Sequence, residues 1–194
     1  MSPDYDHLYE IAEAQAGYFT ASQAQSVGFS WERLSGNVKR GKFVRIRPGV
    51  YRLAHFPGSP YEDLFIAWLR TGPSSTISHE SALSLYELAD VLPGEVHVIV
   101  PRTASRRREG IRLHTNRLEP GDITMRSGLP VTTVERTIAD VIVGGLAAEH
   151  VRQAIQEALR RGLTTPDDLL EQASQRGGIA EKVIRGILTG GAAG

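Results

Sequence analysis

The chain has 194 residues, with 22 lysines and arginines against 22 aspartates and glutamates, and it has no cysteine. This length suffices for one or two domains with their own cores, and the absence of cysteine excludes disulfide scaffolds, thiolate zinc sites and cysteine nucleophiles. No apolar run approaches the ~18 residues of a membrane span, and the first residues lack the features of a signal peptide. We therefore expect a soluble, cytoplasmic protein with no membrane partner.

The N-terminal part of the sequence predicts three short helices. Apolar residues at helical spacing indicate a first helix over residues 5–16. Thr20 and Gln23 form a capping-box pattern that begins a second helix. A third helix, over residues 31–40, follows Ser30, whose hydroxyl can cap it. Short helices separated by a glycine-containing turn are typical of a helix-turn-helix unit.

The third helix has an apolar side. Trp31, Leu34 and Val38 recur at positions i, i+3 and i+7, and we expect this stripe to pack on the first two helices. Trp31 is therefore interpreted as a core residue and not as a side chain that stacks on nucleic acid.

The opposite side of the same helix carries groups that can read DNA. Arginine and asparagine side chains make bidentate contacts with guanine and adenine edges in the major groove, and a glycine lets the backbone approach another surface closely. The base-reading candidates are Arg33, Asn37 and Arg40, with Gly36 among them.

Basic residues are concentrated between Arg33 and Arg52. This segment holds seven basic residues and no acidic one, so it carries +7 while the rest of the chain carries −7. A local excess of this size suits a phosphate backbone, although a solvated surface run is the simpler alternative. The candidates for phosphate or minor-groove contacts are Lys39, Lys42, Arg45, Arg47 and Arg52.

Residues 42–53 predict a β-hairpin with Pro48 and Gly49 in its turn. A two-residue loop places Arg45 opposite Arg52, a like-charged pair that a bound polyanion would stabilise. Three helices followed by a basic hairpin predict a winged helix, in which the third helix enters the major groove; a winged helix used for protein contacts is the alternative. The hairpin face turned away from DNA would consist of Val44, Ile46, Tyr51 and Leu53.

The expected fold class is α+β, with a winged-helix DNA-binding domain over residues 1–56 and a mixed α/β domain with a helical C-terminus over residues 57–194. The last two predicted strands form a hairpin, and Pro130 within it suits only an edge position because proline cannot donate to the ladder. Strands are predicted over residues 95–100, 111–116, 123–126 and 129–132.

Three segments of the second domain, following a winged helix, resemble the AbiEi-type antitoxins of type IV (abortive-infection) toxin–antitoxin systems. This resemblance implies an antitoxin that represses its own operon by binding inverted repeats in double-stranded DNA, together with a cognate toxin that resembles a nucleotidyltransferase. The segments are Ile77-Ser-His-Glu-Ser-Ala-Leu83, Val96-His-Val-Ile-Val-Pro101 and Gly128-Leu-Pro-Val-Thr-Thr-Val-Glu-Arg-Thr-Ile-Ala-Asp140.

Two alternatives to this function stay open. The chain could be an interaction module that counters a toxin without binding DNA, or an orphan transcriptional repressor without a toxin. A second group of arginines near the 101–111 loop, with only Glu109 among them, could contact DNA, dock the toxin or be solvated. This group consists of Arg102, Arg106, Arg107, Arg108, Arg112 and Arg117.

No motif in the sequence indicates an enzyme, a metal or a cofactor. Phosphate-loop, zinc-protease and nucleophile-elbow patterns are absent. Ser78-His79-Glu80 is interpreted as the beginning of a helix, because adjacent residues on a helix do not face each other. His97 and His114 lie on neighbouring predicted strands, but no ligand-spaced third partner is evident. We therefore expect no catalytic residue.

Overall fold

The computed structural model describes residues 2–104 and 107–190, in which two compact units are distinguished. The first unit contains the residues up to Pro73 together with Ser127–Leu129, and the second contains Ser74–Arg126 and the residues from Pro130 onward. The expected α+β class is confirmed, with three N-terminal helices and a small sheet ahead of a mixed α/β part.

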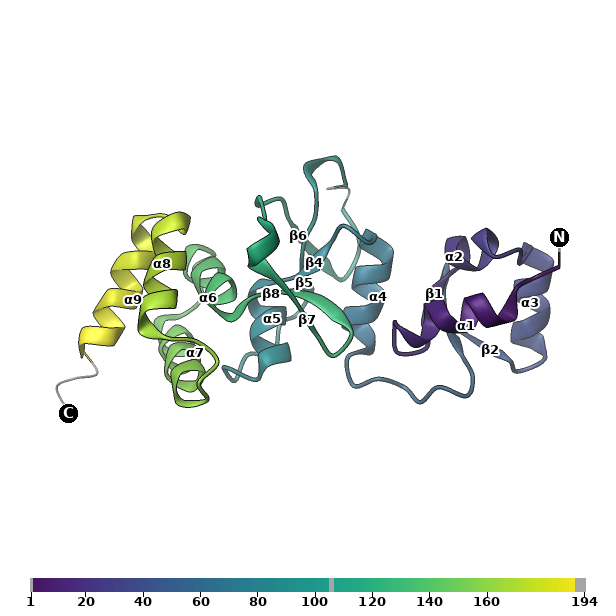
Figure 1. The fold of residues 1–194 in the computed structure, drawn as a ribbon, viewed down its shortest axis with the longest axis horizontal. Coiled ribbons are helices and arrows are strands. Elements are labelled where there is room, and N and C mark those ends of the chain that lie inside the picture. The colour runs from purple at the N-terminus through teal and green to yellow at the C-terminus, as the bar shows by residue number, and fades with distance from the viewer. Residues whose placement is uncertain (1, 105–106, 191–194) are drawn as a thin grey trace. The chain divides into compact units, whose positions relative to one another are not determined.

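The first unit combines helices with a three-stranded sheet (Figure 1). Two predicted helix starts are confirmed. Thr20 Oγ1 accepts from the Gln23 amide and the Gln23 side chain accepts from the Thr20 amide, while Ser30 Oγ accepts from the Arg33 amide. The elements are α1 (Tyr5–Glu13), β1 (Tyr18–Thr20), α2 (Ala21–Ser26), α3 (Trp31–Lys39), β2 (Phe43–Arg47), β3 (Val50–Leu53) and α4 (Glu62–Thr71).

Strand β1 was not expected from the sequence. It lies at the edge of the sheet, but its side chains form part of the core of this unit. It pairs with β3 in the order β1-β3-β2, and its two aromatic residues, Tyr18 and Phe19, are fully buried. Phe19 meets Phe43 edge to face at 5.1 Å between ring centroids, an arrangement that adds to the stability gained from burial. Tyr18 donates a hydrogen bond to Glu62 and stacks on Phe65, which attaches α4 to the sheet.

The predicted hairpin is present, but its register differs from the prediction. A β-bulge between Arg45 and Arg47 shifts the pairing, so that Val44 lies opposite Arg52, and Arg45 lies opposite Tyr51. The expected pairing of Arg45 with Arg52 is therefore wrong, as is the placement of Val44 on the inner face. A bulge inserts one extra residue and exchanges the faces beyond it, which the sequence pattern does not reveal.

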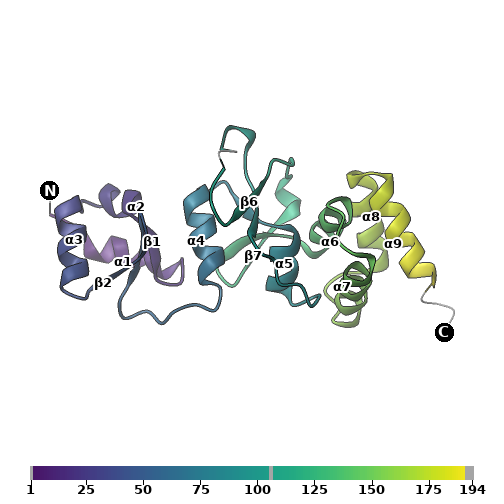
Figure 2. The same cartoon turned by 180° about the vertical axis from the view of Figure 1, so that it is seen from behind.

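The second unit contains a five-stranded mixed sheet and the helical C-terminal part. Figure 1 shows helices α6 to α9 gathered side by side, and Figure 2 shows α5 beside the sheet. The elements are β4 (Thr76–Ile77), α5 (His79–Tyr86), β5 (Val96–Ile99), the 3-10 helix η1 (Arg102–Ala104), β6 (Ile111–His114), the 3-10 helix η2 (Pro120–Asp122), β7 (Ile123–Arg126), β8 (Leu129–Thr132), α6 (Val134–Val143), α7 (Ala148–Arg160), α8 (Pro166–Arg176) and α9 (Gly178–Gly190).

The strand order β6-β5-β4-β8-β7 corrects the expectation for Pro130, because β8 lies inside the sheet and not at its edge. Strand β4 has only two residues, and Ile77 pairs with Val131 alone. No residue of β4 is paired with Pro130, so its missing amide hydrogen interrupts no pairing with this neighbour. None of the helices in the described ranges combines the length and the apolar composition that crossing a bilayer requires.

Gly17 offers a test of the packing in the first unit. Its φ is 88°, and a β-carbon added there would lie 2.4 Å from Phe56 Cβ. We expect Gly17→Ala to combine left-handed backbone strain of about 1–2 kcal/mol with an overpacking penalty of about 1–3 kcal/mol. Gly41→Ala is the matched control, because Gly41 has a φ of 70° but open space around it. Denaturant unfolding should show the larger loss for Gly17→Ala, and equal losses would contradict this packing.

Candidate nucleic-acid interface

Helix α3 packs inward through Leu34, Asn37 and Val38. Leu34 is fully buried and Val38 packs against the core of the first unit, as expected. Trp31, in contrast, is 58% exposed, so its assignment to the core is wrong. The buried residues follow one another at i, i+3 and i+4, and Trp31 in the first turn lies at the margin of the stripe that they form.

Asn37 is 1% exposed, although the sequence suggested that it reads a base edge. Its amide nitrogen donates to the Arg33 carbonyl oxygen at 2.9 Å, and its amide oxygen accepts from the Tyr5 hydroxyl at 3.2 Å. A side chain that joins α3 to α1 in this way cannot reach a base without opening the core. The base-reading expectation for Asn37 is therefore corrected, and its role is to orient α3.

The outward side of α3 and the strand that follows it carry a row of exposed cations. Gly36 lies beneath Arg40, whose guanidinium would be 3.3 Å from a β-carbon at position 36. Within the described ranges, no ion pair engages a member of this row, although Lys42 Nζ lies 5.5 Å from the centre of the Tyr5 ring. We call these residues the basic face: Lys39, Arg40, Lys42, Arg45 and Arg47.

Two arginines expected at this surface, Arg52 and Arg33, are not part of the basic face. Arg52 is half-buried, and its guanidinium lies over the Tyr18 ring at 5.8 Å from the centroid. It therefore packs between β3 and β1, apart from the exposed arginines of β2. Arg33 is exposed on α3 and lies seven residues, about two helical turns, before Arg40.

The arginines of the second group differ in exposure and in their partners. Arg102, Arg107 and Arg112 are exposed, and they lie in or beside the connection between β5 and β6. Arg108 is half-buried and donates to the Ala104 carbonyl oxygen, and Arg117 pairs with Glu119 at 2.9 Å. Arg106 lies outside the described residues. Arg117 is exposed as well. We call Arg102, Arg107 and Arg112 the loop arginines.

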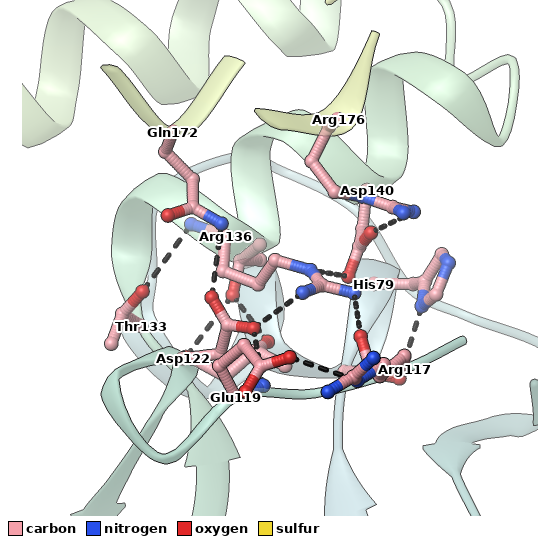
Figure 3. Close-up of polar contacts among 12 residues, drawn as sticks. His79, Arg117, Glu119, Asp122, Thr133, Arg136, Asp140, Gln172 and Arg176 are labelled. Atoms are coloured by element: carbon pink, nitrogen blue, oxygen red, sulfur yellow. Dashed lines mark hydrogen bonds and ion pairs between the residues drawn. The ribbon is translucent and has the colours of Figure 1, made fainter. Parts of the chain in front are cut away.

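A buried ion-pair network holds the helices of the second unit together (Figure 3). Arg136 in α6 is 3% exposed, and its guanidinium donates to Asp140 at 2.9 Å and to Asp122 at 2.6 Å. A third donor of the same guanidinium reaches the Arg117 carbonyl oxygen. Burying charges is costly unless they are paired and hydrogen-bonded, and Arg136 meets both conditions.

Helix α8 completes the network. Arg176 pairs with the second oxygen of Asp140, and Gln172 donates to the second oxygen of Asp122. The charges of two arginines and two aspartates cancel, so the cluster joins α6, η2 and α8 without net charge. The roles of these residues were not predicted from the sequence. The signal that could have identified them is an Arg–Asp pair at i, i+4 within the mostly apolar segment 134–143.

Three of the four histidines of the second unit also come together. Ser78-His79-Glu80 begins α5, as expected, with Ser78 at the N-cap. The ring of His79, however, lies against the ring of His114 at 3.6 Å between centroids and within 5.8 Å of that of His97. The third partner that the sequence did not reveal is therefore His79, which reaches the two strands from the helix.

Comparison with known proteins gives two family matches and a similar fold among solved structures. A family model described as "Transcriptional regulator, AbiEi antitoxin" matches residues 6–54, and one described as "AbiEi antitoxin C-terminal domain" matches residues 76–189. No curated protein matches the chain. The crystal structure of RV2827C protein from Mycobacterium tuberculosis is similar with a TM-score of 0.58 and 15% identity, covering 95% of this chain and 75% of that chain. At this identity, the similarity concerns the fold alone.

We expect Arg136→Met to lower the free energy of unfolding by about 3–5 kcal/mol, because it leaves two buried carboxylates without their main partner. The control is Arg185→Met, which removes an exposed i, i+4 pair with Glu181 and should change that free energy by less than about 0.5 kcal/mol. Urea unfolding followed by circular dichroism measures both variants. Similar small losses in both variants would show that the network does not support the second unit.

Proposed function

Because the chain belongs to the AbiEi family of antitoxins and transcriptional regulators, we propose that it is the antitoxin of a type IV toxin–antitoxin system and the repressor of its own operon. The observation that carries the DNA-binding part is the basic face. It places exposed cations on a helix that packs inward by its opposite side and on the strand directly after it. The protein would bind its operator and repress transcription in the cytoplasm.

The basic face has the chemistry of a phosphate-binding surface. Lys39 and Arg40 lie at the end of α3, while Arg45 and Arg47 lie on β2. Cations without carboxylate partners repel one another in the free protein, and phosphates relieve this repulsion while releasing counterions from the DNA. The zero net charge of the chain does not oppose such binding, because the balancing acidic residues lie outside the segment from Arg33 to Arg52.

The orientation of α3 revises the assignment of roles. With Leu34, Asn37 and Val38 turned inward, helical periodicity turns Glu32, Gly36 and Lys39 most directly outward. Arg33 and Arg40 flank them and remain base-reading candidates, since an arginine fork matches the guanine edge. Trp31, exposed at the start of the helix, supplies an apolar group that can contact a thymine methyl or a sugar.

The antitoxin part of the proposal assigns a nucleotidyltransferase-like toxin as the partner of this chain. The family match over residues 76–189 supports a role for the second unit in countering the toxin. The loop arginines give that unit an exposed basic surface of its own, which suits a second contact with DNA or an acidic surface of the toxin.

We expect Arg33→Ala/Arg40→Ala to abolish the preference for the DNA upstream of the gene over an unrelated duplex. Each lost base contact should reduce discrimination by about 1–3 kcal/mol. Fluorescence anisotropy with both duplexes measures this preference. Asn37→Ala is the control, because it should lower stability while the folded protein keeps its preference. Retention of the preference in the double variant would contradict the placement of α3 in the major groove.

We expect Arg45→Ala and Arg47→Ala each to weaken binding to all duplexes alike. Each lost phosphate contact should reduce the slope of log K against log [salt] by about 0.9. Arg185→Ala, which removes the same charge from α9, should leave the slope unchanged. Applying the same measurement to Arg107→Ala/Arg112→Ala tests the loop arginines, where an unchanged slope would exclude a DNA contact.

We expect neutralisation of the toxin to be separable from repression. The open reading frame beside this gene should encode the nucleotidyltransferase-like toxin, and the test expresses both proteins from unrelated promoters. The variant Lys39→Ala/Arg40→Ala/Arg45→Ala should still restore growth, because repression cannot act in this arrangement. If the wild-type chain gives no protection, it is not an antitoxin of that toxin; if only the triple variant fails at equal protein level, the toxin contacts the basic face.

A further inference from the structure

Three histidines of the second unit have the spacing of metal ligands. One nitrogen from each of His79, His97 and His114 lies within 4.8 Å of the other two. His97 Nδ1 and His114 Nε2 are 3.3 Å apart. Two nitrogens that bind the same tetrahedral Zn²⁺ at the usual bond length are separated by about 3.3 Å, so this pair already has the required distance.

His79 is held toward the other two rings by its backbone. Its φ is 51°, in the left-handed region that residues with a side chain seldom adopt. Strained residues of this kind cluster at binding sites. Ser78 Oγ lies 3.0 Å from His79 Nδ1, and in the tautomer in which Nδ1–H donates to this hydroxyl oxygen, the lone pair is on Nε2. That nitrogen is then free to bind a metal.

Glu80 adds a carboxylate to the three imidazoles. Its Oε2 lies 2.5 Å from His97 Nδ1 and is shielded from solvent. A carboxylate and an imidazole in such close contact share a proton, and a metal ion that binds between them displaces that proton. Three histidine nitrogens and one glutamate oxygen are the donor types of four-coordinate zinc sites.

A metal ligand requires a neutral imidazole, and burial favours this form in all three rings. Burial lowers the pKa of His79 to about 2 and the pKa values of His97 and His114 to about 4. The Arg112 guanidinium acts in the same direction on His97 and His114. The nearby carboxylates favour the protonated rings but do not outweigh burial.

The fixed charges around the cluster tolerate a cation. The positive charges of Arg136 and Arg176 act on His79, and Figure 3 shows His79 beside their shared partner Asp140. Asp122 balances the second of these two positive charges. Glu80 adds a negative charge beside His97, and Arg112 adds a positive charge that acts on His97 and His114.

We propose that His79, His97 and His114, together with Glu80, bind a zinc-class divalent cation. Imidazole ligands select Zn²⁺ and its neighbours in the first transition row over Mg²⁺ and Ca²⁺. The ion would join the beginning of α5 to β5 and β6. Since β5 and β6 stand at the two ends of the connection that carries Arg102 and Arg107, and Arg112 lies on β6, metal binding would also fix the ends of this connection.

The test is a titration of the full chain with Zn²⁺ at neutral pH, followed by calorimetry and by thermal unfolding. We expect one ion per chain and a rise in Tm of about 5 °C or more at a hundredfold excess over Kd. Mg²⁺ should cause no shift, and Co²⁺ should develop the visible absorption of a tetrahedral nitrogen and oxygen site. Absence of stoichiometric Zn²⁺ binding, or an equal shift with Mg²⁺, would overturn the proposal.

Variants locate the ion. His97→Asn and His114→Asn should each weaken Zn²⁺ binding by about a hundredfold or more, while His150→Asn, a half-buried histidine of α7 outside the cluster, should not. Each variant is compared with itself in chelator and in Zn²⁺, so any loss of intrinsic stability cancels. Retention of the zinc-dependent Tm shift in both His97→Asn and His114→Asn would refute the assignment.

Discussion

The second unit depends on the ion pairs and hydrogen bonds that the buried Arg136 guanidinium makes. This guanidinium binds Asp140 in its own helix, Asp122 before β7 and the backbone of residue 117, while α8 supplies partners to both aspartates. Such a cluster gives less stability than an apolar core of equal volume, but its geometry is strict, because an unpaired buried charge is strongly unfavourable. The network therefore fixes the arrangement of α6, η2 and α8, against which the remaining helices pack.

The two units distribute charge for different purposes. In the first, cations are exposed and separated from carboxylates, which suits a surface that binds a polyanion. In the second, the charges of the buried network are paired and balanced, and the loop arginines are among the cations that stay exposed. The whole chain is neutral because the charge of its basic segment and that of its acidic remainder cancel. Only the distribution of the charges is therefore informative about function.

The sequence predicted elements well where local chemistry determines them and less well where tertiary contacts do. Helix starts at Thr20 and Ser30 follow from capping side chains, and the hairpin turn follows from Pro48 and Gly49. The register of that hairpin depends on a bulge. The exposure of Trp31 depends on the rotation of α3 about its own axis, which decides which side of the helix faces the core. The meeting of His79 with two strands 18 and 35 residues away could not be predicted, because no spacing in a sequence encodes the position of a helix over a sheet.

Binding of the full-length chain to the DNA upstream of its own gene is the most direct test of its assignment as an operator-binding antitoxin. The measurement compares this DNA with a duplex of equal length and composition but scrambled sequence, at several salt concentrations. We expect the upstream DNA to bind at least about 10³-fold more tightly, with an affinity that falls steeply as salt rises. Equal affinity for both duplexes, or no dependence on salt, would contradict the assignment.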